Sequence, residues 1–207
     1  MSTIFLSSML LAFSGAMMPG PLLTYTVDES LIHGPRAGIM IITGHALLEV
    51  MLIVFIFLGF DMILQSSAAQ MLIGIVGGVL LIVMGAEMIY KSWKNKIQVE
   101  GKPSRSSARN MVLSGFIISA ANPYFLLWWA VIGLGFLLQA YRGFGLVGIA
   151  VFFVGHITAD YLWYGMISVL VGTTRRFIKQ NLYRIIVLGL GAVLVVFGAS
   201  FAFRALI

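Results

Sequence analysis

The sequence contains no cysteine and few charged residues. Its 207 residues include no Cys, and Asp, Glu, Lys and Arg together make up only 10% of the chain. Without cysteine the protein cannot form a disulfide, a thiol redox relay or a thiolate metal site. The residues that are abundant are apolar, at 60% of the chain with a mean hydropathy of +1.04. These values exclude an ordinary soluble domain and are typical of an integral membrane protein.

Long apolar runs fill most of the chain. A bilayer core about 30 Å thick needs about 20 apolar residues for each helical span. Six runs of this length occur, which leaves no room for a sizeable soluble catalytic domain. We therefore expect an all-α, polytopic membrane protein with six transmembrane helices, at about residues 4–27, 39–60, 70–90, 111–138, 143–170 and 185–203.

The basic residues lie mostly on one side of the expected bundle. Eleven of the 13 Lys and Arg fall in the first, third and fifth connections, and only Arg142 and Arg204 fall on the other side. The positive-inside rule then places the odd-numbered connections in the cytoplasm and both termini outside the cell membrane. The basic loop 91–109 is interpreted as a cytoplasmic topology determinant near anionic lipid head groups, and not as a nucleic-acid-binding tract.

The two halves of the chain carry the same features in the same order. Residues 44–49 have the pattern Gly-His-x-x-x-Glu, and residues 155–160 have the pattern Gly-His-x-x-x-Asp, 111 positions later. Likewise the apolar segment 78–86 resembles the segment 191–199, 113 positions later. Each copy contains three helices, so the second copy must be inverted in the membrane, which is typical of secondary transporters. We expect these units at residues 1–95 and 110–207, joined by a basic cytoplasmic linker at 96–109.

Proline interrupts the first helix of each expected repeat. Pro19, Gly20 and Pro21 lie in the first apolar run, and Asn122 precedes Pro123 in the fourth. Each proline removes a backbone donor and frees a carbonyl one turn earlier. Interrupted helices in matching positions of two repeats indicate a binding site near the bilayer midplane. We predict that these five residues shape that site.

Two His-acid pairs are the main candidates for transport chemistry. His45 and Glu49 share one helix face, as do His156 and Asp160, because each pair is spaced by four residues. A charged group near the bilayer centre costs roughly 2.5–3.5 kcal/mol. We interpret the four residues as a proton relay or a site for a cationic or zwitterionic substrate. Two alternatives remain open: hydrogen bonds that hold helices together, or four ligands for a divalent metal.

The motifs around the breaks are similar to those of a known family. The segment 15–21 reads Gly-Ala-Met-Met-Pro-Gly-Pro and is followed by the Gly-rich connection 34–38 and later by Asn122-Pro123. This order resembles the LysE/RhtB family of amino-acid exporters over essentially the whole chain. The resemblance implies two inverted three-helix repeats and export of small amino acids driven by the proton gradient. Leu22 and Tyr124 depart from residues common in the family, so the solute is not carried over.

These observations predict a secondary active transporter that exports an amino acid or similar small metabolite by proton antiport. The alternative is a divalent metal-cation exporter with His45, Glu49, His156 and Asp160 as ligands. The expected partners are the solute, protons and the lipid bilayer, without cofactor or nucleic acid. Glycine faces permit a homodimer without requiring one. Hydrolase and metalloprotease motifs do not occur in the sequence, so we do not expect an enzyme.

Overall fold

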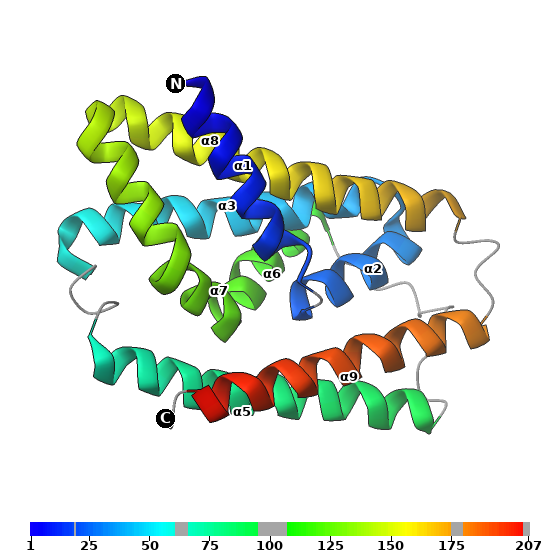
Figure 1. Cartoon of the computed structure of the whole chain (residues 1–207). Coiled ribbons are helices and arrows are strands. Elements are labelled where there is room, and N and C mark those ends of the chain that lie inside the picture. The colour runs from blue at the N-terminus through cyan, green and yellow to red at the C-terminus, as the bar shows by residue number, and fades with distance from the viewer. Residues whose placement is uncertain (19, 61–65, 95–106, 175–179, 205–207) are drawn as a thin grey trace.

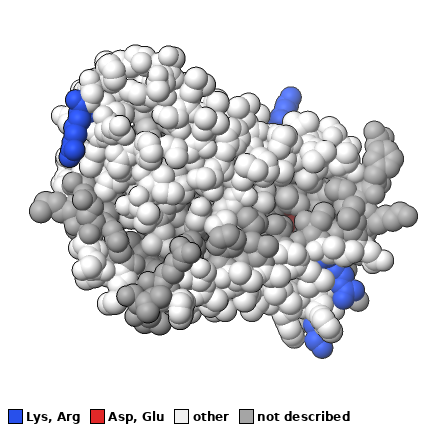
Figure 2. Space-filling view, in the orientation of Figure 1, with Lys and Arg blue, Asp and Glu red and all other residues white. Residues whose placement is uncertain are grey.

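Helices make up all the regular structure in the described part of the protein. The computed structural model describes residues 1–18, 20–60, 66–94, 107–174 and 180–204 (Figure 1). The predicted all-α class is therefore confirmed for these residues. Figure 2 shows that nearly all of the described surface on one face is uncharged, as expected for a protein whose outer surface contacts lipid. Most of the basic linker predicted at 96–109 lies outside the described residues.

Helices cover each of the six apolar runs. The first half contains α1 (Ser2–Ala16), α2 (Pro21–His33), α3 (Ala37–Phe55), the π-helical turn η1 (Ile56–Phe60) and α5 (Ser67–Trp93). The second half contains α6 (Ala108–Ala120), α7 (Pro123–Trp128), the π-helical turn η2 (Trp129–Gly133), α8 (Leu134–Thr174) and α9 (Gln180–Arg204).

Length and composition alone qualify some of these helices as membrane spans. Residues Ala37–Gly59 and Tyr124–Thr174 form two helices that are long and apolar enough to cross a bilayer. The pair α1 and α2 qualifies as a third span if the two are counted together across their 80° bend. The protein is thus helical and suited to a membrane, while the number of six spans remains a prediction.

One connection lies elsewhere than the sequence predicts. We expect a break near residues 139–142, but α8 runs through them and turns at Gly145 instead. Gly145 has φ 60° and ψ −144°, a conformation that side chains with a Cβ rarely adopt. The turn between α2 and α3 is made in the same way at Gly34, with φ 80° and ψ −161°.

The connection between α2 and α3 is fastened to α8. Ser168 in α8 is fully buried, and its Oγ lies 2.8 Å from the Ser30 Oγ. The same hydroxyl accepts a hydrogen bond from the Gly38 backbone N–H at 2.9 Å and donates one to the Pro35 carbonyl at 2.9 Å. A single serine therefore satisfies polar groups from the end of α2, the turn and the start of α3.

Helices α5 and α9 pack side by side and form a separate layer below α3 and α8 in Figure 1. A Cβ added at Gly78 would lie 2.5 Å from the Gly198 carbonyl oxygen, and one at Gly85 would lie 2.5 Å from the Gly191 carbonyl oxygen. These pairings show that the two helices run antiparallel. Because glycine has no side chain, the two backbones come into direct contact along this interface.

Candidate functional site

The break between α1 and α2 occurs where the first proline motif predicts it. Helix α1 ends at Ala16 and α2 begins at Pro21. Between them Gly20 has an extended backbone, with φ −140° and ψ −176°. Pro21 is at the first position of α2, where a missing N–H costs nothing. Pro19 lies outside the described residues.

The second break is capped by Asn122. Helix α6 ends at Ala120, and the Asn122 side-chain oxygen accepts a hydrogen bond from the Tyr124 N–H at 3.1 Å. Pro123 opens α7. This is a common start for a helix, with asparagine as the cap and proline in the first turn. A Cβ added at Gly20 would lie 3.8 Å from the Asn122 Nδ2, so the two breaks lie next to each other.

The glycine that precedes each candidate histidine sets a close helix crossing. A Cβ at Gly44 would overlap the Val112 carbonyl oxygen of α6, and one at Gly155 would overlap the Phe5 carbonyl oxygen of α1. Helix α3 therefore packs directly on α6, and α8 packs directly on α1. One consequence is that the His45 Nδ1, adjacent to this contact, lies 2.9 Å from the Ser119 Oγ of α6.

Glu49 lies at the centre of the polar cluster. Its Oε1 is 2.8 Å from the His156 Nε2 and 3.3 Å from the His45 Nε2. The same oxygen accepts a hydrogen bond from the Trp129 Nε1–H at 3.2 Å. The Glu49 residue is only 1% exposed. Three donors from three helical elements thus converge on one carboxylate oxygen inside the protein.

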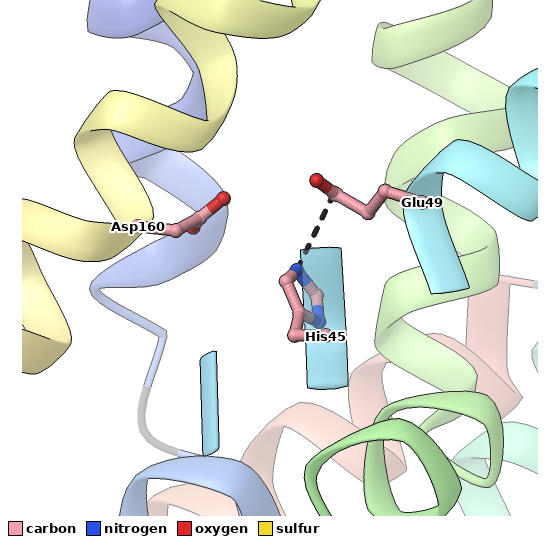
Figure 3. A group of neighbouring side chains, drawn as sticks. All are labelled: His45, Glu49 and Asp160. Atoms are coloured by element: carbon pink, nitrogen blue, oxygen red, sulfur yellow. Dashed lines mark ion pairs between the residues drawn. The ribbon is translucent and has the colours of Figure 1, made fainter. Parts of the chain in front are cut away.

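Asp160 is the second carboxylate of the cluster. It is 3% exposed, and its Oδ2 lies 3.6 Å from the His156 Nε2. Figure 3 shows Asp160 and Glu49 reaching toward each other from α8 and α3, with His45 paired to Glu49. The closest contact, however, joins His156 to Glu49 and so links the two predicted pairs. The structure thus brings all four candidate residues into one cluster.

A cavity of about 60 Å³ adjoins this cluster, enough for several water molecules. The four candidate residues line it, together with residues of both helix breaks, among them Gly20 and Asn122. Its lining includes no Lys or Arg among the described residues. Of the nine residues predicted for the site, seven lie on this cavity or beside it. Pro21 and Pro123 open the two helices that border it, without being named in its lining.

Several lining residues were not expected from the sequence. Trp128 and Trp129 were interpreted as interface or packing residues, yet both line the cavity. The Trp128 and Trp129 rings lie 4.9 Å and 5.5 Å from the His156 ring, measured between centroids. One signal was present: positions 122, 125 and 129 share a helical face, so the asparagine of the break predicts Phe125 and Trp129 as neighbours of the site.

The cluster can hold a proton or a cation. The Asp160 Oδ2 and the Glu49 Oε2 are buried and have no hydrogen-bond partner among the described residues. A buried carboxylate oxygen without a partner favours a proton or a positively charged group beside it. The histidines supply a second kind of proton carrier at hydrogen-bond distance.

Apolar helices with two breaks around a buried ionisable cluster define a class of protein, the membrane transporters. Within that class the family is clear, because the family model for LysE type translocators matches residues 13–205. The chain belongs to this family, and the resemblance given above is confirmed. It is a membrane transport protein and not an enzyme. Searches of curated proteins and of solved structures found no match.

Proposed function

We propose that the protein is a secondary active exporter of an amino acid or a similar small metabolite, driven by proton antiport. One observation carries the proposal: four buried ionisable residues share a cavity with both helix breaks. Antiport needs a site that holds either protons or the solute, in turn. The unpartnered carboxylate oxygens of Asp160 and Glu49 provide such a site, because a proton and a substrate ammonium group compete for the same oxygens.

Two inverted repeats, each of three spans, are part of the proposal. Gly34 and Gly145 support this symmetry, since they are 111 residues apart and both have a positive φ. The same offset separates the two Gly-His motifs. In the layer formed by α5 and α9, an offset of 113 residues exchanges the Gly78–Gly198 contact with the Gly85–Gly191 contact. Such pairs of equivalent contacts are expected when two copies of one unit face each other in opposite orientations.

In this arrangement the solute binds between the repeats. Its ammonium group pairs with Asp160, whose Oδ2 has no hydrogen-bond partner among the described residues. Its carboxylate lies at the start of α2, where Gly20 and Leu22 line the cavity and no side chain caps the helix. The free N–H groups and the dipole at a helix start favour an anion. His45 and His156 pass protons to and from Glu49.

The orientation follows the charge distribution. We place both termini outside the cell membrane and the basic loop 91–109 in the cytoplasm, with repeats at 1–95 and 110–207 around the linker 96–109. The outward direction of transport comes from the family. Oligomeric state stays open between a monomer and a homodimer.

The test is transport by the purified protein in liposomes. An interior more acidic than the outside should drive a labelled amino acid into the vesicles, because protons leave as the solute enters. Accumulation should stop when a protonophore removes the gradient. If no amino acid accumulates above the level of protein-free liposomes, or if accumulation ignores the gradient, the proposal fails.

A divalent metal cation is the second candidate solute. One observation favours it: His45, Glu49 and Asp160 each offer a ligand atom, and these atoms lie within 4.8 Å of one another. Histidine nitrogens and carboxylate oxygens are common ligands of Zn²⁺. Thermal stabilisation by Zn²⁺ that chelator reverses, and that His45→Ala removes, would favour the metal. Stabilisation by an amino acid that persists in chelator would favour the amino-acid exporter.

A further inference from the structure

The cavity has one wall of a different chemical character from the polar cluster. Leu81 of α5 and Leu194 of α9 line it, and each is 2% exposed. The ionisable residues come from α3 and α8, whereas α5 and α9 form the opposite layer in Figure 1. The two leucines are 113 residues apart, the same offset that relates the two glycine contacts of this layer. One face of the cavity is therefore polar and the opposite face is aliphatic.

The polar wall accommodates only one further positive group. The Glu49 Oε1 already receives contacts from His45, His156 and Trp129. Asp160 is the other carboxylate among the described lining residues, and its Oδ2 has no hydrogen-bond partner among them. A solute with two cationic groups would place the second one against the leucine wall. Burying a charge against aliphatic side chains without a partner is strongly unfavourable.

An acidic side chain fits no better. The described lining holds no Lys or Arg to pair with a second carboxylate. A glutamate or aspartate solute would therefore leave one negative group near Leu81 and Leu194. It would also bring more negative charge to a cavity that already contains Glu49 and Asp160.

We propose that the solute is an amino acid with an uncharged, apolar side chain, which packs against Leu81 and Leu194 while its head group binds at the polar wall. This inference rests on the proposed exporter function and deepens it by naming the class of side chain. Leu81 and Leu194 are then residues that determine specificity. Burial of each additional methylene of the solute against them increases affinity severalfold.

The experiment measures the affinity of the purified full chain for five probes: glycine, alanine, leucine, lysine and glutamate. Each dissociation constant comes from the concentration dependence of thermal stabilisation. Leucine should bind roughly tenfold or more tightly than glycine, and lysine and glutamate should not compete with it. Tighter binding of lysine or glutamate than of leucine would overturn the inference.

Two substitutions test the wall itself. Leu81→Ala should reduce the leucine-to-glycine affinity ratio by roughly tenfold. Leu194→Phe should fill part of the cavity and weaken leucine binding more than alanine binding. Leu72→Ala is the control, because Leu72 is on the same helix as Leu81 but is 62% exposed. A ratio that stays unchanged in both wall variants, while both still bind glycine, would overturn the role of the leucines.

The outcomes separate this inference from the proposed function. If none of the five amino acids stabilises the protein, the amino-acid exporter is wrong and the inference is overturned with it. If amino acids bind and their uptake depends on the proton gradient, but apolar side chains have no advantage, only the inference is wrong.

Discussion

Gly44→Ala should destabilise the protein because it forces α3 and α6 apart. The added Cβ would overlap the Val112 carbonyl oxygen and would lie 2.7 Å from the Phe116 backbone N. Ordinary contact begins near 3.4 Å, so the two helices must separate by about 0.7 Å or more. The clash is with backbone atoms, which no change of rotamer relieves. Overpacking of this kind costs about 1–3 kcal/mol, against a gain of at most about 1 kcal/mol from the better helix propensity of alanine.

We therefore expect Gly44→Ala to lower the free energy of unfolding by about 2 kcal/mol. Gly135→Ala is the matched control, since Gly135 is helical and has nothing within 4 Å of an added Cβ. That variant should be as stable as the wild type or slightly more stable.

The assay is thermal unfolding of both variants in the same detergent, followed by transport in liposomes. His45 follows Gly44 in the sequence and contacts Ser119 across the same crossing. Separation of the helices should therefore also slow transport, by an order of magnitude or more, because site geometry tolerates little displacement. Equal melting temperatures for the two variants would refute the claim that Gly44 sets this crossing.

Three further substitutions have definite expected outcomes. Ser168→Ala should cost about 1–3 kcal/mol in urea unfolding, since the buried Gly38 N–H loses its acceptor; an unchanged midpoint would argue against the serine as a fastening point. Trp129→Phe should weaken proton-coupled uptake in liposomes, because Glu49 loses a hydrogen bond from the indole N–H; wild-type uptake would show that this bond is dispensable. Glu87→Gln should leave the melting temperature unchanged, because the Lys91–Glu87 pair is more than half exposed.

Local patterns in the sequence predict much of the site. The proline motifs predict both helix breaks, because proline and the small residues around it end a helix whatever the tertiary context. Spacing by four residues predicts that each histidine lies near its acid, since that distance is one turn of a helix. The family follows from the order of these motifs and is confirmed by the match to residues 13–205.

Long-range contacts could not be predicted in this way. The shortest contact of the cluster joins His156 to Glu49, 107 residues apart, and depends on how α8 packs against α3. The hydrogen bond from Trp129 and the leucine wall of α5 and α9 depend on packing in the same way. The turn at Gly145 was missed because hydropathy marks a break by polar residues, whereas the chain turns at a glycine within an apolar segment. The six-span inverted repeat and the role of the site residues stay predictions.

The central claim is that the buried carboxylates couple protons to the solute, and Asp160→Asn and Glu49→Gln in liposomes test it most directly. Each variant is measured in two modes: uptake driven by a pH gradient, and exchange of labelled for unlabelled solute without a gradient. We expect both variants to lose gradient-driven uptake, with Glu49→Gln retaining exchange because Asp160 still binds the ammonium group. Gradient-driven uptake at the wild-type level in both variants would contradict the account.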